Sequence, residues 1–323
     1  MKKILSFSVL TALLTWAACK DQNTYQDSNR KRPVQSPSPT PGGNNPNPNG
    51  NGTGNTTAGT FKFCMTGDTG SGESDQDDVA KAMESEKCNA VVIAGDVIYD
   101  SGIDSADDKQ LTSKFFKPFE GLMNGQNLPM YLTLGNHDYR GDPKPWLDVA
   151  KKNPKVIMPN LWYDAQPAPG ICLFAYDTND SQPEQEKWFS GVKSKYTGNC
   201  KFSIAIAHHP YRSSGHHKGE LESANKKLME SSILGKVDLF FAAHEHHLED
   251  AGAENGTKLL IAGGGGRDLR ALEADPVGGF GLSSFGYLTL TVNGSNANFD
   301  FIAVKGSTKK SVHNGTIQGK GLR

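Results

Sequence analysis

The feature that most constrains this chain is a repeated pattern, in which short apolar runs each end at polar residues that are able to bind metal. The run at residues 90–94 is apolar throughout, which is typical of a strand buried on both faces. The other runs have similar lengths and are bounded by turn residues, so we predict that they are strands too. The predicted strands cover residues 61–65, 90–94, 130–134, 171–176, 202–207, 239–243, 258–262, 287–292 and, as a last candidate, 298–304.

Helix-like segments separate the early strands but not the late ones. Residues 77–87 carry apolar side chains at helical spacing, and residues 111–122 also have a helical pattern. Strands that alternate with helices favour a parallel sheet, whose strands carry their carboxyl ends to one edge. The late segments have hairpin-like turns such as Asn293-Gly294, which favours antiparallel strands and a second, packed sheet. The sequence therefore predicts an α/β domain.

The composition changes sharply near residue 59. The chain has 323 residues and a formal net charge of −1, so it lacks the basic excess that is typical of nucleic-acid-binding proteins. The residues before about 59 contain no stretch that could build a core, whereas the apolar runs begin at residue 60. We predict one domain at residues 60–305, followed by a polar, basic tail or edge strand at residues 306–323.

The N-terminal segment has the pattern of an export signal followed by a tether. Residues 1–18 combine a basic start with an apolar run that is too short for a comfortable transmembrane helix, and we interpret them as a signal peptide. Residues 19–59 are rich in Pro, Asn, Gly, Ser and Thr and cannot bury enough apolar surface to fold. We predict that they form a disordered tether.

A cysteine follows the predicted signal peptide. Ala17-Ala18-Cys19 resembles the lipobox of bacterial lipoproteins, although Trp16 stands where that family prefers leucine. We therefore expect an exported protein of the bacterial periplasm or of the outer membrane and cell surface, attached to the membrane only through a lipid on Cys19. The alternative is ordinary cleavage after Ala18 without a lipid.

The other four cysteines are compatible with disulfides. None of them shows the CxxC spacing of a zinc ribbon. In an exported protein four cysteines allow two disulfides with three connectivities, and free buried thiols are the alternative. The favoured pair is Cys172 with Cys200, because both lie next to sequential predicted strands, and the remaining two are Cys64 and Cys88.

The side chains collected at the predicted strand ends are oxygen or imidazole donors, and none is a thiolate. Such a mixture suits Fe, Mn or Zn rather than an iron–sulfur cluster. Six groups exceed what one ion needs, whereas two ions that share a bridging carboxylate would use them all. Two neighbouring metal ions are a known device for in-line displacement at phosphorus. The six donors are Asp68, Asp96, Asn136, His208, His244 and His246.

Five motifs at these strand ends resemble, in the same order, those of calcineurin-like metallophosphoesterases. Tyr99, three residues after Asp96, resembles the tyrosine of purple acid phosphatases, whose tyrosinate binds ferric iron. The sequence around residues 104–119 and 278–280 is most similar to the small, tartrate-resistant type. The resemblance covers roughly residues 60–304 and implies a four-layer αββα sandwich with two mixed sheets. The motifs are Asp68-Thr-Gly70, Gly95-Asp-Val-Ile-Tyr99, Gly135-Asn-His-Asp138, Ala207-His-His-Pro210 and Ala243-His-Glu-His246.

The resemblance also implies how the donors divide between two ions. Asp96 would bridge an Fe(III) ion and a second ion, which would be Fe, Zn or Mn. The first ion would be held by Asp68, Asp96, Tyr99 and His246, and the second by Asp96, Asn136, His208 and His244.

Three residues are predicted to act on substrate. His137 would contact the substrate or assist the leaving group, and Asn136 counts with it as catalytic besides binding metal. His217, nine residues after His208, would contact phosphate, with His216 as the alternative.

Two positions depart from the motifs of this family. Ala243 stands where the family usually has glycine, and we expect its methyl group to be tolerated. His209 replaces an aromatic residue that is common in similar proteins, and its ring can fill similar space.

Several of these residues also have simpler interpretations when taken singly. Asp96 could be a helix N-cap and Tyr99 a core aromatic, and His216 and His217 could lie in a solvated loop. His247 is expected to face solvent or to bond a residue behind the ligands. Residues 263–266 are all glycine but lack the ending of a phosphate-binding P-loop, so we predict a tight turn where the backbone approaches the site.

The resulting prediction is a monomeric phosphomonoesterase, resembling acid phosphatases, in which a metal-bound hydroxide attacks a small phosphorylated substrate. The first alternative is a phosphodiesterase or nucleotide hydrolase of the same superfamily that uses Mn or Zn. The second is a surface lipoprotein that binds a ligand without turnover. No nucleic acid is expected as a specific ligand. Substrate choice is expected to depend on the loops at residues 139–160 and 211–218.

Overall fold

The structure is a computed structural model that describes residues 59–181 and 183–323. The predicted signal peptide, Cys19 and the predicted tether up to residue 58 lie outside the described residues. Within the described part, no helix combines the length and the apolar character that a membrane crossing requires.

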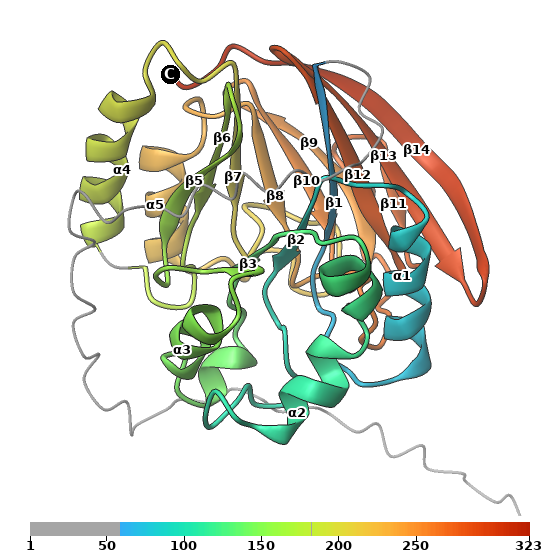
Figure 1. The fold of residues 1–323 in the computed structure, drawn as a ribbon. Coiled ribbons are helices and arrows are strands. Elements are labelled where there is room, and N and C mark those ends of the chain that lie inside the picture. The colour runs from blue at the N-terminus through green and yellow to red at the C-terminus, as the bar shows by residue number, and fades with distance from the viewer. Residues whose placement is uncertain (1–58, 182) are drawn as a thin grey trace, which may run out of the picture. The chain divides into compact units, whose positions relative to one another are not determined.

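Two seven-stranded mixed sheets form the framework of the described residues (Figure 1). In the first sheet, β1 to β4 are parallel, and β12 pairs with β1 in the antiparallel direction. The late strands are antiparallel, as predicted, but they extend the first sheet beside β1 instead of forming the second sheet. Across the sheet the strands are β14 (Thr308–Gln318), β13 (Asn296–Lys305), β12 (Gly286–Asn293), β1 (Thr60–Thr66), β2 (Ala90–Ala94), β3 (Met130–Thr133) and β4 (Val156–Ile157).

The second sheet has a parallel centre flanked by antiparallel strands. Its strands β10, β8, β7 and β6 are parallel, whereas β5, β9 and β11 are antiparallel to their neighbours. Across the sheet the strands are β11 (Phe280–Leu282), β9 (Leu248–Glu254), β10 (Thr257–Ala262), β8 (Leu239–Ala242), β7 (Phe202–Ile206), β6 (Ile171–Ala175) and β5 (Tyr163–Ala168).

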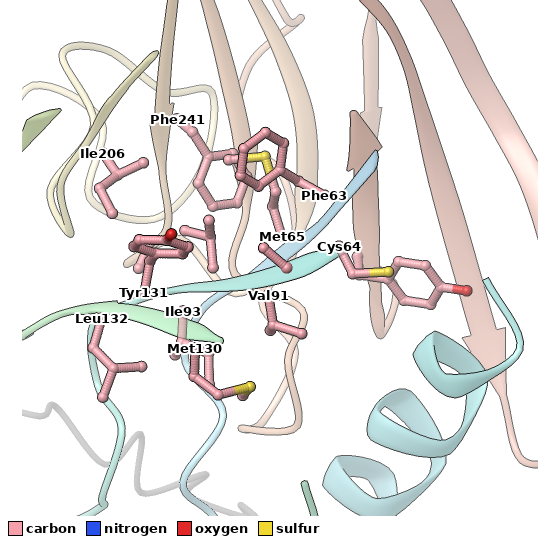
Figure 2. Close-up of a cluster of buried hydrophobic side chains, with 14 of the residues drawn as sticks. Phe63, Cys64, Met65, Val91, Ile93, Met130, Tyr131, Leu132, Ile206 and Phe241 are labelled. Carbon is pink, nitrogen blue, oxygen red and sulfur yellow. The ribbon is translucent and has the colours of Figure 1, made fainter. Parts of the chain in front are cut away.

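The main core lies between the sheets. In Figure 2, Phe63 and Met65 of β1 lie beside Phe241 of β8, and Tyr131 of β3 lies close to Ile206 of β7. These side chains are almost completely buried. Because successive side chains of a strand point to opposite faces, Cys64 points away from this layer. The buried apolar faces explain why the sequence pattern identifies these strands.

Helices cover the outer faces of the sheets and complete four layers. Helix α1 (Ser74–Glu84) packs on the first sheet, where the Tyr287 hydroxyl of β12 donates to the Ala82 carbonyl at 3.2 Å. Helices α4 (Pro183–Tyr196) and α5 (Ser223–Ser232) share a second apolar cluster with β6, β7 and β8. Figure 1 shows this pair on the side opposite to α1. The predicted αββα sandwich with two mixed sheets is therefore confirmed.

The predicted helix at residues 111–122 is the main error in the local assignments. The chain forms a short helix α2 (Lys109–Leu111) and then two π-helical turns, Thr112–Phe116 and Gly121–Gly125. The Lys114 carbonyl accepts a hydrogen bond of 2.5 Å from the Gln76 side chain, which competes with regular α-helical bonding. Helix α1 also begins and ends three residues before the predicted segment 77–87.

The remaining elements connect the sheets or lie at their edges. A helix α3 (Pro145–Lys152) and a 3₁₀ turn, Asp138–Arg140, follow β3. Residues predicted as a tail or edge strand form the edge strand β14. The structure pairs Cys172 with Cys200, which confirms the favoured disulfide, and it pairs Cys64 with Cys88.

Candidate metal centre

The predicted donors follow the carboxyl ends of strands from both sheets. In the first sheet, Asp68 follows β1, Asp96 follows β2 and Asn136 follows β3; in the second, His208 follows β7 and His244 follows β8. Parallel strands bring their carboxyl ends to one edge, so residues far apart in the sequence meet there. The Gly67 amide, just after β1, donates to the Ala262 carbonyl of β10 at 3.0 Å, which ties the two sheets together beside the site.

One group of donors gathers around the Tyr99 hydroxyl. This hydroxyl donates to Asp68 Oδ1 at 2.9 Å and lies 3.2 Å from His246 Nε2. His246 Nε2 is also 3.6 Å from Asp68 Oδ1. The three side chains are almost completely buried. They match the donors that the sequence assigns to the first ion, apart from the shared carboxylate.

A second group of donors gathers around His208 Nε2. Asn136 Oδ1 lies 3.0 Å from this nitrogen, His244 Nδ1 lies 3.2 Å away and Asp96 Oδ2 lies 3.5 Å away. His208 Nδ1 donates to the Ala94 carbonyl at 2.8 Å, so Nε2 is the nitrogen that faces the group. A cation at this point would satisfy several acceptor atoms at once.

Asp96 lies between the two groups. One ligand atom from each of Asp68, Asp96 and His208 lies within 4.8 Å of the other two. Burial raises the pKa of Asp96, but the charges of His208 and His137 and a hydrogen bond from Tyr99 outweigh burial, so the pKa lies below its usual value. Burial raises the pKa of Asp68 well above its usual value, and the charge of Asp96 adds to the effect. Of the two carboxyl groups, Asp96 is therefore the one that favours the ionised form.

The imidazoles of the centre are held in a form that can bind metal. Burial lowers the pKa of His246 to about 3, and burial followed by the charges of His209 and His208 lowers that of His244 well below its usual range. His246 Nδ1 donates to the Asp268 carbonyl at 2.6 Å, which fixes the ring and leaves Nε2 toward Tyr99. Neutral imidazoles oriented by a carbonyl are the usual state of histidine ligands.

Burial beside two carboxylates also affects the phenol. The pKa of Tyr99 is raised well above its usual value by burial first and then by the charges of Asp68 and Asp96. Ionisation of this phenol therefore requires a nearby positive charge, which a metal ion held by the same donors would provide. The donor set fits Fe, Mn or Zn, because it consists of oxygen and imidazole atoms that converge on shared points.

Three predicted ligands have backbone conformations in the left-handed region. The φ angles are 56° at Asp68, 48° at Asp96 and 71° at His244. Only a few per cent of non-glycine residues have such angles, and Asp, Asn and His are the side chains that tolerate them best. Strained backbone of this kind concentrates at functional sites. The conformation turns each side chain from the end of its strand toward the centre.

Glycines let the backbone approach the donors. A Cβ atom at Gly135 would lie 2.1 Å from Asp96 Oδ1, and one at Gly263 would lie 2.4 Å from Asp68 Oδ2. The glycine run at residues 263–266 therefore allows the predicted close approach, although a positive φ angle is found there only at Gly266. Close packing also explains why alanine is tolerated at position 243. A Cβ atom at Gly67 would lie 2.3 Å from the Ala243 methyl group. The missing side chain of Gly67 leaves room for that methyl.

Comparisons with known proteins agree with this arrangement. The family model of the calcineurin-like phosphoesterases matches residues 61–248. The chain belongs to the calcineurin-like phosphoesterase family.

Relatives within this family include purple acid phosphatases. Purple acid phosphatase 3 of Arabidopsis thaliana is 30% identical over 247 residues, which cover 65% of this chain and 64% of that protein. Tartrate-resistant acid phosphatase type 5 of Oryctolagus cuniculus is 23% identical over 213 residues, which cover 58% of this chain and 64% of that protein. The matched part thus spans slightly less than two thirds of the length of both relatives.

Solved structures with a similar fold include two proteins that share less than 20% sequence identity with this chain. The structure described as GAP50, the anchor in the inner membrane complex of Plasmodium, has a TM-score of 0.69 and 19% identity, and covers 81% of this chain and 90% of that chain. A dimetal phosphatase from Danio rerio has a TM-score of 0.52 and 14% identity, and covers 80% of this chain and 98% of that chain. At this level of identity the two structures show the fold.

In this calcineurin-like phosphoesterase, His137 lies at the margin of the centre. Its ring is 4.4 Å from that of Tyr99, and its amide donates to Asp96 Oδ1 at 2.9 Å. His137 Nδ1 donates to the Asp100 carbonyl at 2.8 Å. The half-buried ring is therefore fixed beside the donors.

The other histidines have distinct surroundings. The ring of His217 stacks on that of His244 at 4.3 Å, whereas His216 is exposed and faces Glu273. His209 Nδ1 lies 2.8 Å from Thr178 Oγ1, and a ring nitrogen of His209 lies within 4.8 Å of those of His208 and His244. Burial lowers the pKa of His209 to about 3.

His247 does not face solvent, so that interpretation is wrong. The side chain is completely buried, and Nε2 lies 2.8 Å from Glu249 Oε2. The alternative interpretation, a bond to a residue behind the ligands, agrees with the structure. Glu249 in turn accepts hydrogen bonds from both the amide and the hydroxyl of Ser214 at 3.0 Å.

The sequence predictions assign no role to two kinds of residue at the site. The first kind is a residue that connects the loops of the donors, and it is represented by Asp138. Asp138 accepts hydrogen bonds from the amides of Val97, Ile98 and Gly135 at 2.9–3.1 Å, and thereby joins the loops that carry Asp96 and Asn136. Its position within the Asn-His-Asp motif was the available signal.

The second kind consists of loop residues beside the donors. We call residues 211–218 and 267–270 the rim. The Arg267 guanidinium lies 4.9 Å from the centre of the Tyr99 ring, and Arg270 contacts His217 Nε2. The signal for these residues in the sequence is a pair of arginines that follows a glycine run.

Proposed function

We propose that this chain is a phosphomonoesterase with two metal ions and with chemistry like that of the acid phosphatases. The observation that carries the proposal is the pair of donor groups that share Asp96, with the Tyr99 hydroxyl in the first group. The purple and tartrate-resistant acid phosphatases among its relatives support the same choice.

The residues proposed to hold the ions are those of the two donor groups. The first ion, proposed as Fe(III), would be held by Asp68, Tyr99 and His246, and the second, proposed as Fe, Zn or Mn, by Asn136, His208 and His244, with Asp96 shared. When bound, such a pair supplies Lewis acidity toward phosphate oxygens and lowers the pKa of water.

The chain itself contributes position and proton transfer. Asp138 holds the loops of the second group together, and the carbonyls of Ala94 and Asp268 orient His208 and His246. His137 uses Nδ1 for the Asp100 carbonyl, so a proton for the departing oxygen would come from Nε2. The half-buried position of His137 beside the donors suits this role.

Metal analysis of the full chain, combined with a visible spectrum, tests the proposal. We expect two metal ions per chain, iron among them, and a broad visible band that Tyr99→Phe removes. Less than one metal per chain in the wild-type protein would contradict the dinuclear centre. Two ions without iron and without a band would retain the centre but reject the tyrosinate-bound Fe(III).

Substrate class needs a separate measurement. We expect faster hydrolysis of an aryl phosphate than of a bis-aryl phosphate under the same conditions. The reverse order would favour a phosphodiesterase, and a metal-loaded chain that is inactive on a broad panel of phosphoesters would favour a ligand-binding lipoprotein.

Export, lipid attachment at Cys19 and a monomeric state are further proposals. The signal-peptide pattern supports export, and two disulfides suit an oxidising compartment. Incorporation of labelled fatty acid in bacterial cells, absent in Cys19→Ser, is the expected result for lipid attachment. Labelling of neither protein would contradict it. Light scattering of the detergent-free chain with Cys19→Ser should give the mass of one chain.

A further inference from the structure

Arg270 differs from most other arginines of the described residues in its partners. Arg212, Arg267 and Arg323 pair with carboxylates at 2.8–3.2 Å. Within residues 59–181 and 183–323, no carboxylate lies within 4.0 Å of Arg270, and its side chain contacts His217 Nε2 instead. Its backbone amide donates to the His246 carbonyl at 3.2 Å. A half-buried guanidinium without a carboxylate partner is thus fixed beside the metal centre.

The contact with Arg270 determines which His217 nitrogen carries hydrogen. A guanidinium can only donate, so His217 Nε2 is the acceptor. His217 Nδ1 lies 2.7 Å from Glu220 Oε2 and donates to it. Both ring nitrogens are therefore engaged, and Nε2 presents no hydrogen to an anion. The phosphate contact that the sequence predicts for His217 needs a different donor, and Arg270 has further N–H groups.

The charge of Arg270 acts on the donors of the centre. The Arg270 side chain contacts His217, whose ring stacks on that of His244 at 4.3 Å, so its charge lies close to the donors. A cation beside a site that binds further cations is repelled by them unless an anion lies between. A phosphate ester is such an anion, because its oxygens can accept two parallel hydrogen bonds from one guanidinium.

The position of His217 is itself fixed from behind the centre. The His217 amide donates to Glu245 Oε1 at 2.9 Å, and the Ser213 hydroxyl donates to the same oxygen. Glu245 lies between the donors His244 and His246 in the chain. The ring of His217 packs flat on that of His244, with an interplanar angle of 28°. His217 is therefore held rigidly enough to orient Arg270.

We propose that Arg270 binds the phosphate group of the substrate, and that His217 is a positioning residue that orients the guanidinium. The inference rests on the proposed phosphoester chemistry and assigns the anion-binding role to a residue of the rim. It accounts for a cation that has no carboxylate partner and for a histidine whose two nitrogens are both engaged.

Calorimetric titration of the metal-loaded full chain with inorganic phosphate, at fixed pH and salt, tests the assignment. We expect Arg270→Gln to weaken phosphate binding about 10- to 100-fold, since a hydrogen bond to a charged group is lost. Arg270→Lys, which keeps the charge but not the fork, should lie between this variant and the wild type. The matched control is Arg323→Gln, whose arginine is paired with Asp238 before strand β8, and we expect a change below about threefold. Metal content should stay the same in all variants.

A double-mutant cycle tests the role of His217. If His217 acts through Arg270, His217→Asn should weaken phosphate binding in the wild type and have little further effect in Arg270→Gln. Equal effects in both backgrounds would mean that His217 binds phosphate itself, and would overturn the positioning role. Phosphate affinity within twofold of the wild type in Arg270→Gln, or an equal loss in Arg323→Gln, would overturn the assignment of Arg270.

A measurement on the wild-type protein tests the same inference without requiring that any variant folds. Phosphate should slow the modification of Arg270 by an arginine-specific reagent, as followed by peptide mass spectrometry, and should leave the modification of Arg323 unchanged. Equal modification of Arg270 with and without phosphate would reject the inference. Phosphate binding that depends on Arg270, in a chain that hydrolyses no phosphomonoester, would reject the proposed function and leave the anion site standing.

Discussion

The metal centre and the rim lie side by side but are held in place by different means. In the centre, the donors follow the ends of buried strands, and backbone pairing across two sheets determines where they lie. In the rim, side chains determine the positions: Glu245 holds the amide of His217, and His217 holds Arg270. The comparison indicates that binding of metal and binding of substrate can be changed separately. Substitutions at Asp96 and at Glu245 test this separation, and one at Asp177 examines a strand-end carboxylate outside both regions.

The largest effect is expected at Asp96, in the centre. Asp96→Asn keeps an oxygen for the His137 amide but removes the charge shared by the two donor groups. We expect at least a 100-fold loss of affinity for the metals, with loss of phosphatase activity, because even residues behind the ligands contribute about 10- to 100-fold. Metal titration of the metal-free chain measures this.

The control for this substitution is Asp107→Asn, at an exposed carboxylate that pairs with Lys152. It should bind both ions as the wild type does. Wild-type metal affinity in Asp96→Asn would show that the two donor groups do not depend on a shared carboxylate.

The second effect is expected at Asp177, which follows strand β6 but does not join the centre. Its carboxylate accepts hydrogen bonds from the Tyr139 hydroxyl and, at 2.9 Å, from the Asn179 amide. Burial raises the pKa of Asp177 from 3.8 to about 6, despite these hydrogen bonds. The folded state therefore holds this proton more tightly than the unfolded state does. The resulting contribution to stability is complete below about pH 4 and is lost as pH rises through 6.

The size of the Asp177 effect follows from the shift of about two pKa units, which corresponds to roughly 2–3 kcal/mol. Asp177→Asn should remove that much of the fall in unfolding free energy between pH 4 and pH 7, as measured by urea denaturation. Metal content at pH 7 should not change. Loss of metal would place Asp177 functionally within the centre, and an unchanged pH dependence would contradict the raised pKa.

The smallest effect is expected at Glu245, which supports the rim. Glu245→Ala leaves the His217 amide without its acceptor, and we expect phosphate affinity to fall about tenfold, as for loss of one hydrogen bond. Glu245→Gln keeps an acceptor oxygen and should stay within about threefold of the wild type. Both variants should retain two ions. Loss of metal in either one would show that the rim and the centre are not separable.

The difference between donors at strand ends and rim residues in loops explains how far the sequence could predict the molecule. The donors were found because an apolar strand that ends in Asp or His is visible in the sequence, as at Ala94 before Asp96. Sheet geometry then places such ends together. The position of Arg270 depends on how a loop after β10 returns to the site, and no periodic pattern encodes that path.

Strand β9 shows a second limit of sequence patterns. Its residues Glu249 and Asp250 are buried charges, so the segment has no apolar run. Asp250 pairs with Lys258 of the adjacent strand at 2.6 Å, and Glu249 is bonded by His247 and Ser214. Lys258 and Ser214 come from other segments and compensate the burial of charge, which a single stretch of sequence cannot reveal.

The left-handed backbone at Asp68, Asp96 and His244 also limits how this site can evolve. A β-branched or large aliphatic replacement would be unfavourable at these points even if the protein no longer bound metal, because the turn of the chain excludes it. A descendant that lost its chemistry would still be selected, for folding alone, to keep Asp, Asn, Gly or His there. The residue type at these positions therefore depends on the backbone conformation as well as on activity. Inactive members of such a lineage would be recognised by changes at Tyr99, Asn136 or His246, where the φ angle is not restricted in this way.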